Sequence, residues 1–176
     1  WSKKTLGMKQ NRIFIVGSPG SGKTTLAKAL SRKLQIPHFD LDNIRFMPNG
    51  TRRPDGEAIP LVESLTQHKS GLIEGIYISW ISHLTHKANL IVWLDTPFYK
   101  ALYRILLRYL KNLRQNQYGF KSTIILLKNL ILFHLLRDPN NSYITRKQTH
   151  NLISNHKGEV LHIKNNHDLQ RLFDKP

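Results

Sequence analysis

The chain has 176 residues, no cysteine and a formal net charge of +16. The lack of cysteine excludes disulfides, thiolate zinc sites and cysteine nucleophiles, and no stretch reaches the roughly 20 apolar residues of a transmembrane helix. A hydrophobic content of 40% fits one globular domain over residues 1–176, with 1–7 a candidate upstream remnant before Met8. Since the first residues also lack an apolar leader, we expect a cytoplasmic protein.

The first half of the chain alternates apolar runs with helical spacing. Residues 12–17 form an apolar run that ends in glycine and predicts a buried strand, and residues 23–34 carry apolar positions at helical spacing. A second, short strand is expected at 36–40. Residues 45–60 are rich in proline, glycine and charge, which predicts a loop before a helix near 58–68.

The second half of the chain continues this alternation. Two continuous apolar runs predict strands that are covered on both faces, at 71–75 and 90–95. Helices are expected at 98–113, 122–136, 143–155 and 167–173, and a last strand at 159–163. Strands that alternate with helices indicate an α/β fold with three layers, α/β/α, around a mainly parallel five-stranded sheet.

A phosphate-loop motif, G-x-x-x-x-G-K-T, stands between the first predicted strand and the first predicted helix. Glycines let the backbone curve so that its N–H groups face a phosphate, and the helix start adds a positive dipole end. Lys23 is expected to reach the β- and γ-phosphates, and the Thr24 hydroxyl to ligate Mg²⁺. The residues predicted to bind ATP are Gly17, Ser18, Pro19, Gly20, Ser21, Gly22, Lys23, Thr24 and Thr25.

Acidic residues stand at or near the ends of three of the predicted strands. Asp95 is favoured as a further Mg²⁺ ligand, the alternative being a cap for the helix after Pro97. Glu74 is its rival, because ligands of open α/β sheets gather beyond the carboxyl ends of the strands. Asp40 and Asp42, two residues apart, point the same way if extended. Asp40 is then a metal ligand and Asp42 the group that orients or deprotonates an acceptor hydroxyl, unless Asp42 only caps a short helix.

The region 98–150 is strongly basic. Between residues 97 and 150 stand ten Lys or Arg and one acid, Asp138. Such a field attracts nucleotide phosphates, nucleic acid or an anionic membrane, or it is a solvated surface with no single partner. Arg104 and Arg108 lie one helical turn apart and share a face. With Arg114 they are the candidate lid residues, and Arg104 and Arg108 the catalytic ones.

Four blocks together resemble a known group, the adenylate-kinase-like P-loop kinases often called DNA topology modulation proteins. The blocks lie at residues 15–25, 37–43, 72–77 and 90–97. The group usually has Asp where this chain has Glu74, and the Asp40-x-Asp42 pair also resembles shikimate-kinase-type enzymes. The resemblance implies phosphoryl transfer without naming the acceptor, and an association with DNA conformation.

Two functions remain open from the sequence. The first is a Mg²⁺-dependent, ATP-binding kinase that transfers the γ-phosphoryl group to a small hydroxyl or nucleotide acceptor. The second is a nucleotide-dependent nucleic-acid-binding protein, in which the region 98–150 meets DNA through basic residues interleaved with Tyr103, Tyr109, Tyr118 and Phe120. The kinase is preferred, because the same aromatic residues suit amphipathic helices. Peripheral membrane attachment through the basic helices is a third, weaker idea.

Overall fold

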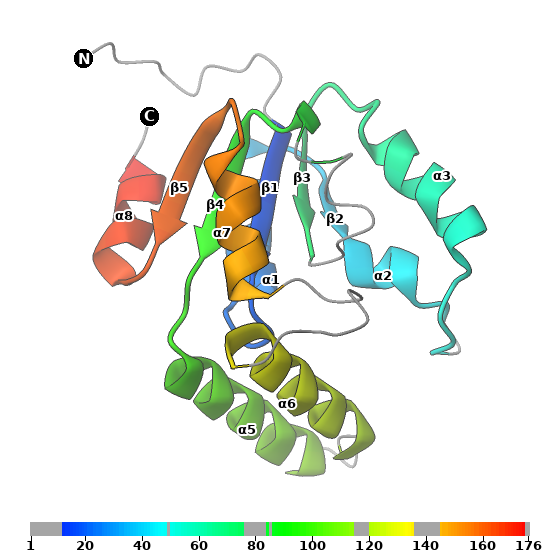
Figure 1. Cartoon of the computed structure of the whole chain (residues 1–176), viewed down its shortest axis with the longest axis vertical. Helices are drawn as coiled ribbons and strands as arrows, with labels where there is room; N and C mark the ends of the chain where they lie inside the picture. The colour runs from blue at the N-terminus through cyan, green and yellow to red at the C-terminus, as the bar shows by residue number, and fades with distance from the viewer. Residues whose placement is uncertain are drawn as a thin grey trace.

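Five parallel strands form the centre of the molecule (Figure 1). The structure is a computed structural model that describes residues 12–48, 50–75, 84, 86–114, 120–135 and 145–174. The strands are β1 (Arg12–Gly17), β2 (His38–Asp40), β3 (Gly71–Glu74), β4 (Leu90–Leu94) and β5 (Glu159–Ile163), in the order β2-β3-β1-β4-β5. All four pairings are parallel, which confirms the predicted sheet.

The described helices are α1 (Lys23–Leu34), α2 (Leu41–Arg45), α3 (Asp55–Leu65), α5 (Phe98–Arg114), α6 (Phe120–His134), α7 (Arg146–Ser154) and α8 (Asn166–Asp174). Two of them differ from the expectation. The loop predicted at 45–60 is shorter, because α3 begins at Asp55, directly after Pro54, with Asp55 and Glu57 in its first turn. A short helix, α2, follows β2 immediately, and Asp40 rather than Asp42 caps it.

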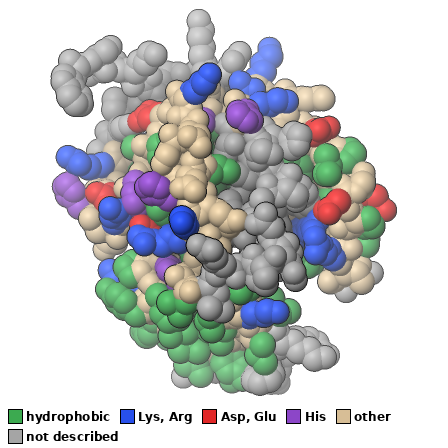
Figure 2. Space-filling view, viewed as in Figure 1, with side chains coloured by type: hydrophobic (Ala, Val, Ile, Leu, Met, Phe, Trp, Pro, Cys, Tyr) green, Lys and Arg blue, Asp and Glu red, His purple; other side chains and the backbone are tan. Residues whose placement is uncertain are grey.

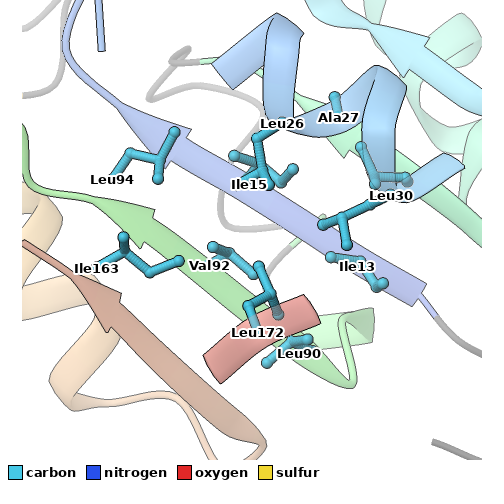
Figure 3. Close-up of a cluster of buried hydrophobic side chains, with 11 residues drawn as sticks. Ile13, Ile15, Leu26, Ala27, Leu30, Leu90, Val92, Leu94, Ile163 and Leu172 are labelled. Carbon is cyan, nitrogen blue, oxygen red and sulfur yellow. The ribbon is translucent and has the colours of Figure 1, made fainter. Parts of the chain in front are cut away.

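Each strand of the sheet presents alternate residues to two different helical layers. Ile13 and Ile15 of β1 face one layer, in which Leu26 and Leu30 of α1 and Leu172 of α8 complete a buried cluster (Figure 3). The next residues along β1, Phe14 and Val16, face the other layer. There they pack with Leu41 of α2, Val62 of α3, Phe133 of α6 and Ile153 of α7. The predicted three-layer α/β/α architecture is therefore present.

Helices α5 and α6 pack against each other beyond the end of the sheet, at the bottom of Figure 1. Their own small core consists of Ala101, Ile105 and Leu130, all fully buried. Because β4 ends at Leu94 and α5 begins at Phe98, the first turn of α5 is held close to the loop that follows β1. Among the helices of the described part, none is long and apolar enough to cross a membrane.

The close approach between this loop and α5 predicts an effect on stability. Gly20 has φ 74°, and a Cβ there would lie 2.6 Å from the Ala101 carbonyl oxygen. We expect Gly20→Ala to lower the free energy of unfolding by about 2 kcal/mol or more, because backbone strain and a clash with backbone add up. Gly56→Ala is the control, since nothing lies within 4 Å of a Cβ at this position of α3. Equal urea-denaturation midpoints for the two variants would contradict the close approach.

Candidate functional site

The phosphate-loop residues connect β1 to α1, in the predicted order of strand, loop and helix. Gly20 and Gly22 have φ values of 74° and 98°, which side chains other than glycine rarely adopt. The two serines of the loop are buried, with exposed fractions of 1% for Ser18 and 4% for Ser21. Their hydroxyl oxygens have no hydrogen-bond partner. Unpaired buried hydroxyls are costly, so the loop offers donors that suit an anion.

Two cations lie against the backbone of this loop. The Lys23 ammonium donates to the carbonyl oxygens of Gly17, at 3.0 Å, and Ser18, at 3.1 Å. Arg104 reaches over from α5 and donates to the Ser21 carbonyl oxygen at 2.7 Å. Burial lowers the pKa of Lys23, although the nearby carboxylates of Asp42, Glu74 and Asp40 oppose this shift.

Glu74, at the end of β3, is the carboxylate that meets the loop. Its side chain accepts a hydrogen bond from the Thr24 hydroxyl at 3.1 Å, and its other oxygen lies 2.9 Å from His38 Nε2. Only 1% of the residue is exposed. Burial raises the pKa of Glu74, and the neighbouring charge of Asp40 raises it further; the hydrogen bond from Thr24 and the charge of Lys23 oppose this only in part.

Asp40 and Asp42 both reach the same site, but not as two residues of an extended strand. Asp40 ends β2 opposite Glu74 in the β2–β3 pairing. It caps α2 by accepting a hydrogen bond from the Asp42 backbone N–H at 2.9 Å, so Asp42 lies in the first turn of that helix. Burial raises the pKa of Asp40, and the charge of Asp42 adds to this, while the capping hydrogen bond lowers it.

A cavity of about 400 Å³ brings most of these groups together. The loop and the first turn of α1 form one wall, and three carboxylates from β2, α2 and β3 form another. Helices α5 and α6 close the remaining side. The lining residues are Pro19, Gly20, Gly22, Lys23, Thr24, Thr25, Asp40, Asp42, Glu74, Gly75, Arg104, Ile105, Arg108, Leu126, Asn129 and Phe133. Two of the three predicted lid arginines, Arg104 and Arg108, are among them, whereas the side chain of Arg114 lies outside the described residues.

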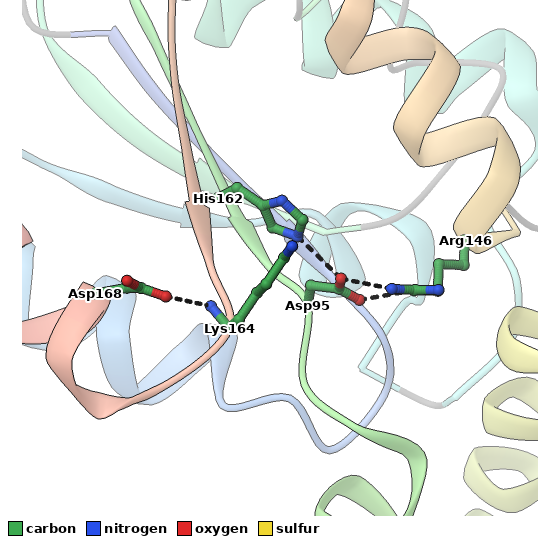
Figure 4. Close-up of polar contacts among 5 residues, drawn as sticks. All are labelled: Asp95, Arg146, His162, Lys164 and Asp168. Atoms are coloured by element: carbon green, nitrogen blue, oxygen red, sulfur yellow. Dashed lines mark hydrogen bonds and ion pairs between the residues drawn. The ribbon is translucent and has the colours of Figure 1, made fainter.

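Asp95 is not among the residues that line this cavity. Its two carboxylate oxygens accept hydrogen bonds from Arg146 at the start of α7, both at 2.8 Å, and one of them lies 2.9 Å from His162 Nε2 (Figure 4). Burial raises the pKa of Asp95, but the hydrogen bonds from Arg146 and His162 outweigh it and lower the pKa overall. The geometry thus favours Glu74 over Asp95 beside Thr24, and the metal role of Asp95 stays a prediction.

Sequence reasoning missed several partners in this region. The sequence predicts His38 only as part of a strand, yet it contacts Glu74, and Asn129 and Phe133 of α6 line the cavity. Arg146 and His162 lie 51 and 67 residues from the aspartate that they bind, Asp95. No local spacing signals such pairs. The position of His162 on the last predicted strand, parallel to β4, was the one available indication.

Oxygen atoms beside the phosphate loop are of the kind that could hold a magnesium ion. Within the described ranges, no group of three or more His, Cys, Asp or Glu side chains could hold a metal ion. Mg²⁺ commonly binds through one or two carboxylates together with water and substrate phosphates. The Thr24 hydroxyl and the Glu74 carboxylate, 3.1 Å apart beside the phosphate loop, provide oxygen ligands of this kind.

The buried Glu74 predicts a gain of stability when its charge is removed. A carboxyl group whose pKa is raised on folding holds its proton more tightly in the folded state. Stability therefore falls as the pH rises from the ordinary glutamate pKa through the raised one, and at neutral pH ionised Glu74 is destabilising. We expect Glu74→Gln to raise the Tm at neutral pH in nucleotide-free buffer, by about 2–4 °C per kcal/mol gained.

The control for this measurement is Glu63→Gln, at an exposed position on α3. It should leave the Tm nearly unchanged. The difference in Tm between Glu74→Gln and the wild type should shrink as the pH is lowered, because Glu74 is then protonated in the wild type too. A Glu74→Gln variant that is less stable than the wild type at neutral pH would contradict this account of the carboxylate.

The chain is similar to known proteins over part of its length. The chain is 32% identical over 93 residues to the uncharacterized protein YqaC of Bacillus subtilis, which covers 51% of each chain. It is 64% identical over 31 residues to the shikimate kinase of Bacteroides fragilis, which covers 18% of this chain and 17% of that one. The chain thus spans about half, or less, of the length of these curated relatives.

A solved structure and a family model extend the comparison. The structure of a sugar kinase from Janibacter sp. HTCC2649 has a TM-score of 0.50 at 13% identity and covers 94% of both chains, a likeness of fold alone. The family model described as "ATPase family associated with various cellular activities (AAA)" matches residues 13–130, from β1 into α6. This span contains the phosphate loop, Glu74 and both cavity arginines. The chain therefore belongs to the ATPase family associated with various cellular activities (AAA).

Proposed function

We propose that the protein is an ATP- and Mg²⁺-dependent kinase that transfers the γ-phosphoryl group to a small hydroxyl or nucleotide acceptor. One observation carries the proposal: a single cavity of about 400 Å³ is lined by the phosphate loop, by three carboxylates and by two arginines. Phosphoryl transfer needs these parts, because catalysis consists mainly of alignment and charge neutralisation. The similarity to the Bacteroides fragilis shikimate kinase supports the same class of reaction.

In this proposal the loop and three cations bind the triphosphate. The Lys23 ammonium and the Arg104 guanidinium already lie at the loop, where they donate to backbone carbonyls. Arg108, one turn further along α5, lines the same cavity. Positive charge from these side chains would stabilise the charge that develops on the transferring phosphoryl group. The helix start at Lys23 adds its dipole to the same end of the cavity.

The metal-binding role falls to Thr24 and Glu74, with Asp40 nearby. All three residues line the cavity, and two of them, Glu74 and Asp40, are carboxylates whose pKa is raised by burial. Burial of two adjacent acids is unfavourable without a compensating cation. A magnesium ion would supply this charge and would polarise the phosphate oxygens when bound.

The acceptor would bind on the α2 and α6 side of the cavity. Asp42 lies in the first turn of α2, and Asn129 and Phe133 line the cavity from α6. A carboxylate in this position can orient an acceptor hydroxyl and take its proton. An aromatic ring and an amide beside it suit a small polar compound with an apolar face.

The phosphate-loop assignment predicts the effect of Lys23→Ala. We expect turnover to fall by about a hundredfold or more, because a charge at the transferring group is lost. Lys28→Ala is the matched control, since Lys28 is an exposed residue on the same helix. Release of ADP would be followed with Mg²⁺ and a panel of hydroxyl compounds, nucleosides and nucleotides. Equal turnover of both variants, with unchanged thermal stability, would refute the assignment.

The acceptor side predicts a different pattern for Asp42→Asn. This variant should keep its ATP binding and lose most of its transfer to the acceptor, because the acceptor hydroxyl depends on the carboxylate. ATP affinity would be measured by calorimetry and transfer by ADP release. Asp168→Asn, on α8 outside the cavity, serves as the control. A variant that lost ATP affinity and kept its transfer rate at saturating ATP would reverse the assigned roles.

A further inference from the structure

Exposed apolar side chains gather on the α5–α6 pair. Of the twelve large hydrophobic residues that are exposed in the described part of the chain, ten lie on these helices or directly after α6. They are Tyr99, Tyr103, Leu106, Leu107, Leu110, Leu113, Ile124, Ile125, Ile131 and Leu135. Figure 2 shows hydrophobic side chains covering the lower end of the molecule, where α5 and α6 lie in Figure 1. Large exposed apolar patches usually mark a binding surface.

Helix α5 has three distinct faces. Ala101 and Ile105 lie on the buried face. An exposed apolar stripe runs along a second face at alternating spacings of four and three residues, and consists of Tyr99, Tyr103, Leu106, Leu110 and Leu113. A third face is basic and consists of Lys100, Arg104, Arg108 and Lys111. The four basic residues differ in position: Arg104 and Arg108 line the cavity, whereas Lys100 and Lys111 do not.

Helix α6 repeats the pattern of exposed apolar and basic residues. Ile124, Lys128, Ile131 and Leu135 follow each other at spacings of four, three and four, and all are exposed. They therefore share one face. Lys128 lies in the middle of this stripe. Its aliphatic stem can lie along an apolar surface while its ammonium extends away from that surface. The opposite side of α6 contributes Leu130 and Phe133 to the buried clusters.

The charge around these stripes has one sign. The segment 97–137 contains eight Lys or Arg and no Asp or Glu. A surface with this composition is complementary to an anionic partner. Apolar stripes with Lys and Arg beside them, as on α5 and α6, are typical of helices that lie in a membrane interface.

We propose that the α5–α6 pair binds the surface of an anionic phospholipid membrane. The apolar stripes enter the boundary between headgroups and acyl chains, and Lys100, Lys111 and Lys128 contact the lipid phosphates. A second copy of the chain would suit the apolar stripes, but it would bring like charges together. Nucleic acid would suit the basic residues, but it would leave the leucines and isoleucines without a partner. An anionic membrane accommodates both features.

The test is vesicle flotation, with vesicles of phosphatidylcholine alone and with phosphatidylglycerol mixed in. We expect the wild type to float with the anionic vesicles, and binding to fall as salt is raised. Leu106→Ser combined with Leu110→Ser should lower the bound fraction by about tenfold or more, because apolar burial contributes much of interfacial binding. Leu61→Ser, at an exposed leucine of α3, is the matched control and should bind like the wild type.

A second pair of variants tests the charge. Lys100→Gln combined with Lys111→Gln should lower binding to anionic vesicles several-fold, whereas Lys69→Gln combined with Lys157→Gln, at exposed positions elsewhere, should not. Thermal unfolding would verify that all variants fold. The proposal is wrong if the wild type binds neither kind of vesicle. It is also wrong if the leucine variants bind vesicles like the wild type, or if their only effect is to convert a dimer into monomers. Salt-sensitive binding to duplex DNA without vesicle binding would assign the face to nucleic acid instead.

Discussion

The hydrogen bond from the Thr24 hydroxyl to the Glu74 carboxylate joins the start of α1 to the end of β3, and the candidate site is built around it. It depends on the parallel pairing of β1 with β3, which sets Ile15 opposite Glu74 just before the phosphate loop begins. The pairing of β2 with β3 then sets Asp40 opposite Glu74. Because parallel strands end at the same edge of the sheet, three segments far apart in sequence deliver their polar groups to one cavity.

The charges in this cavity oppose folding and favour a ligand. Burial raises the pKa of Glu74 and Asp40 and lowers the pKa of Lys23, so burial destabilises the charged form of each group. Acidic and basic groups with perturbed pKa values in one cavity are typical of functional sites. Arg104 connects this cavity to the α5–α6 pair, because it donates to the loop from the same helix that carries the exposed apolar stripe. The nucleotide site and the proposed membrane surface therefore share one helix.

The sheet and the phosphate loop could be predicted from sequence, because buried parallel strands read as continuous apolar runs and the loop motif has a fixed spacing. The choice between Glu74 and Asp95 could not be made in this way. Both end apolar strands, but only Glu74 lies beside Thr24, while Arg146 and His162 from distant segments occupy the carboxylate of Asp95. The N-terminal cap of the short helix α2 could not be predicted for a similar reason: whether Asp40 or Asp42 caps the helix depends on the residue at which β2 ends.

The central claim is that the Thr24–Glu74 pair forms the magnesium side of a nucleotide site. Its most direct test is calorimetric titration of ATP, with and without Mg²⁺, into the wild type, Glu74→Gln and Asp95→Asn. We predict that Mg²⁺ strengthens ATP binding to the wild type and to Asp95→Asn by the same factor, and that most of this gain disappears in Glu74→Gln. Preserved magnesium dependence in Glu74→Gln, together with its loss in Asp95→Asn, would contradict the account and return the metal to the end of β4.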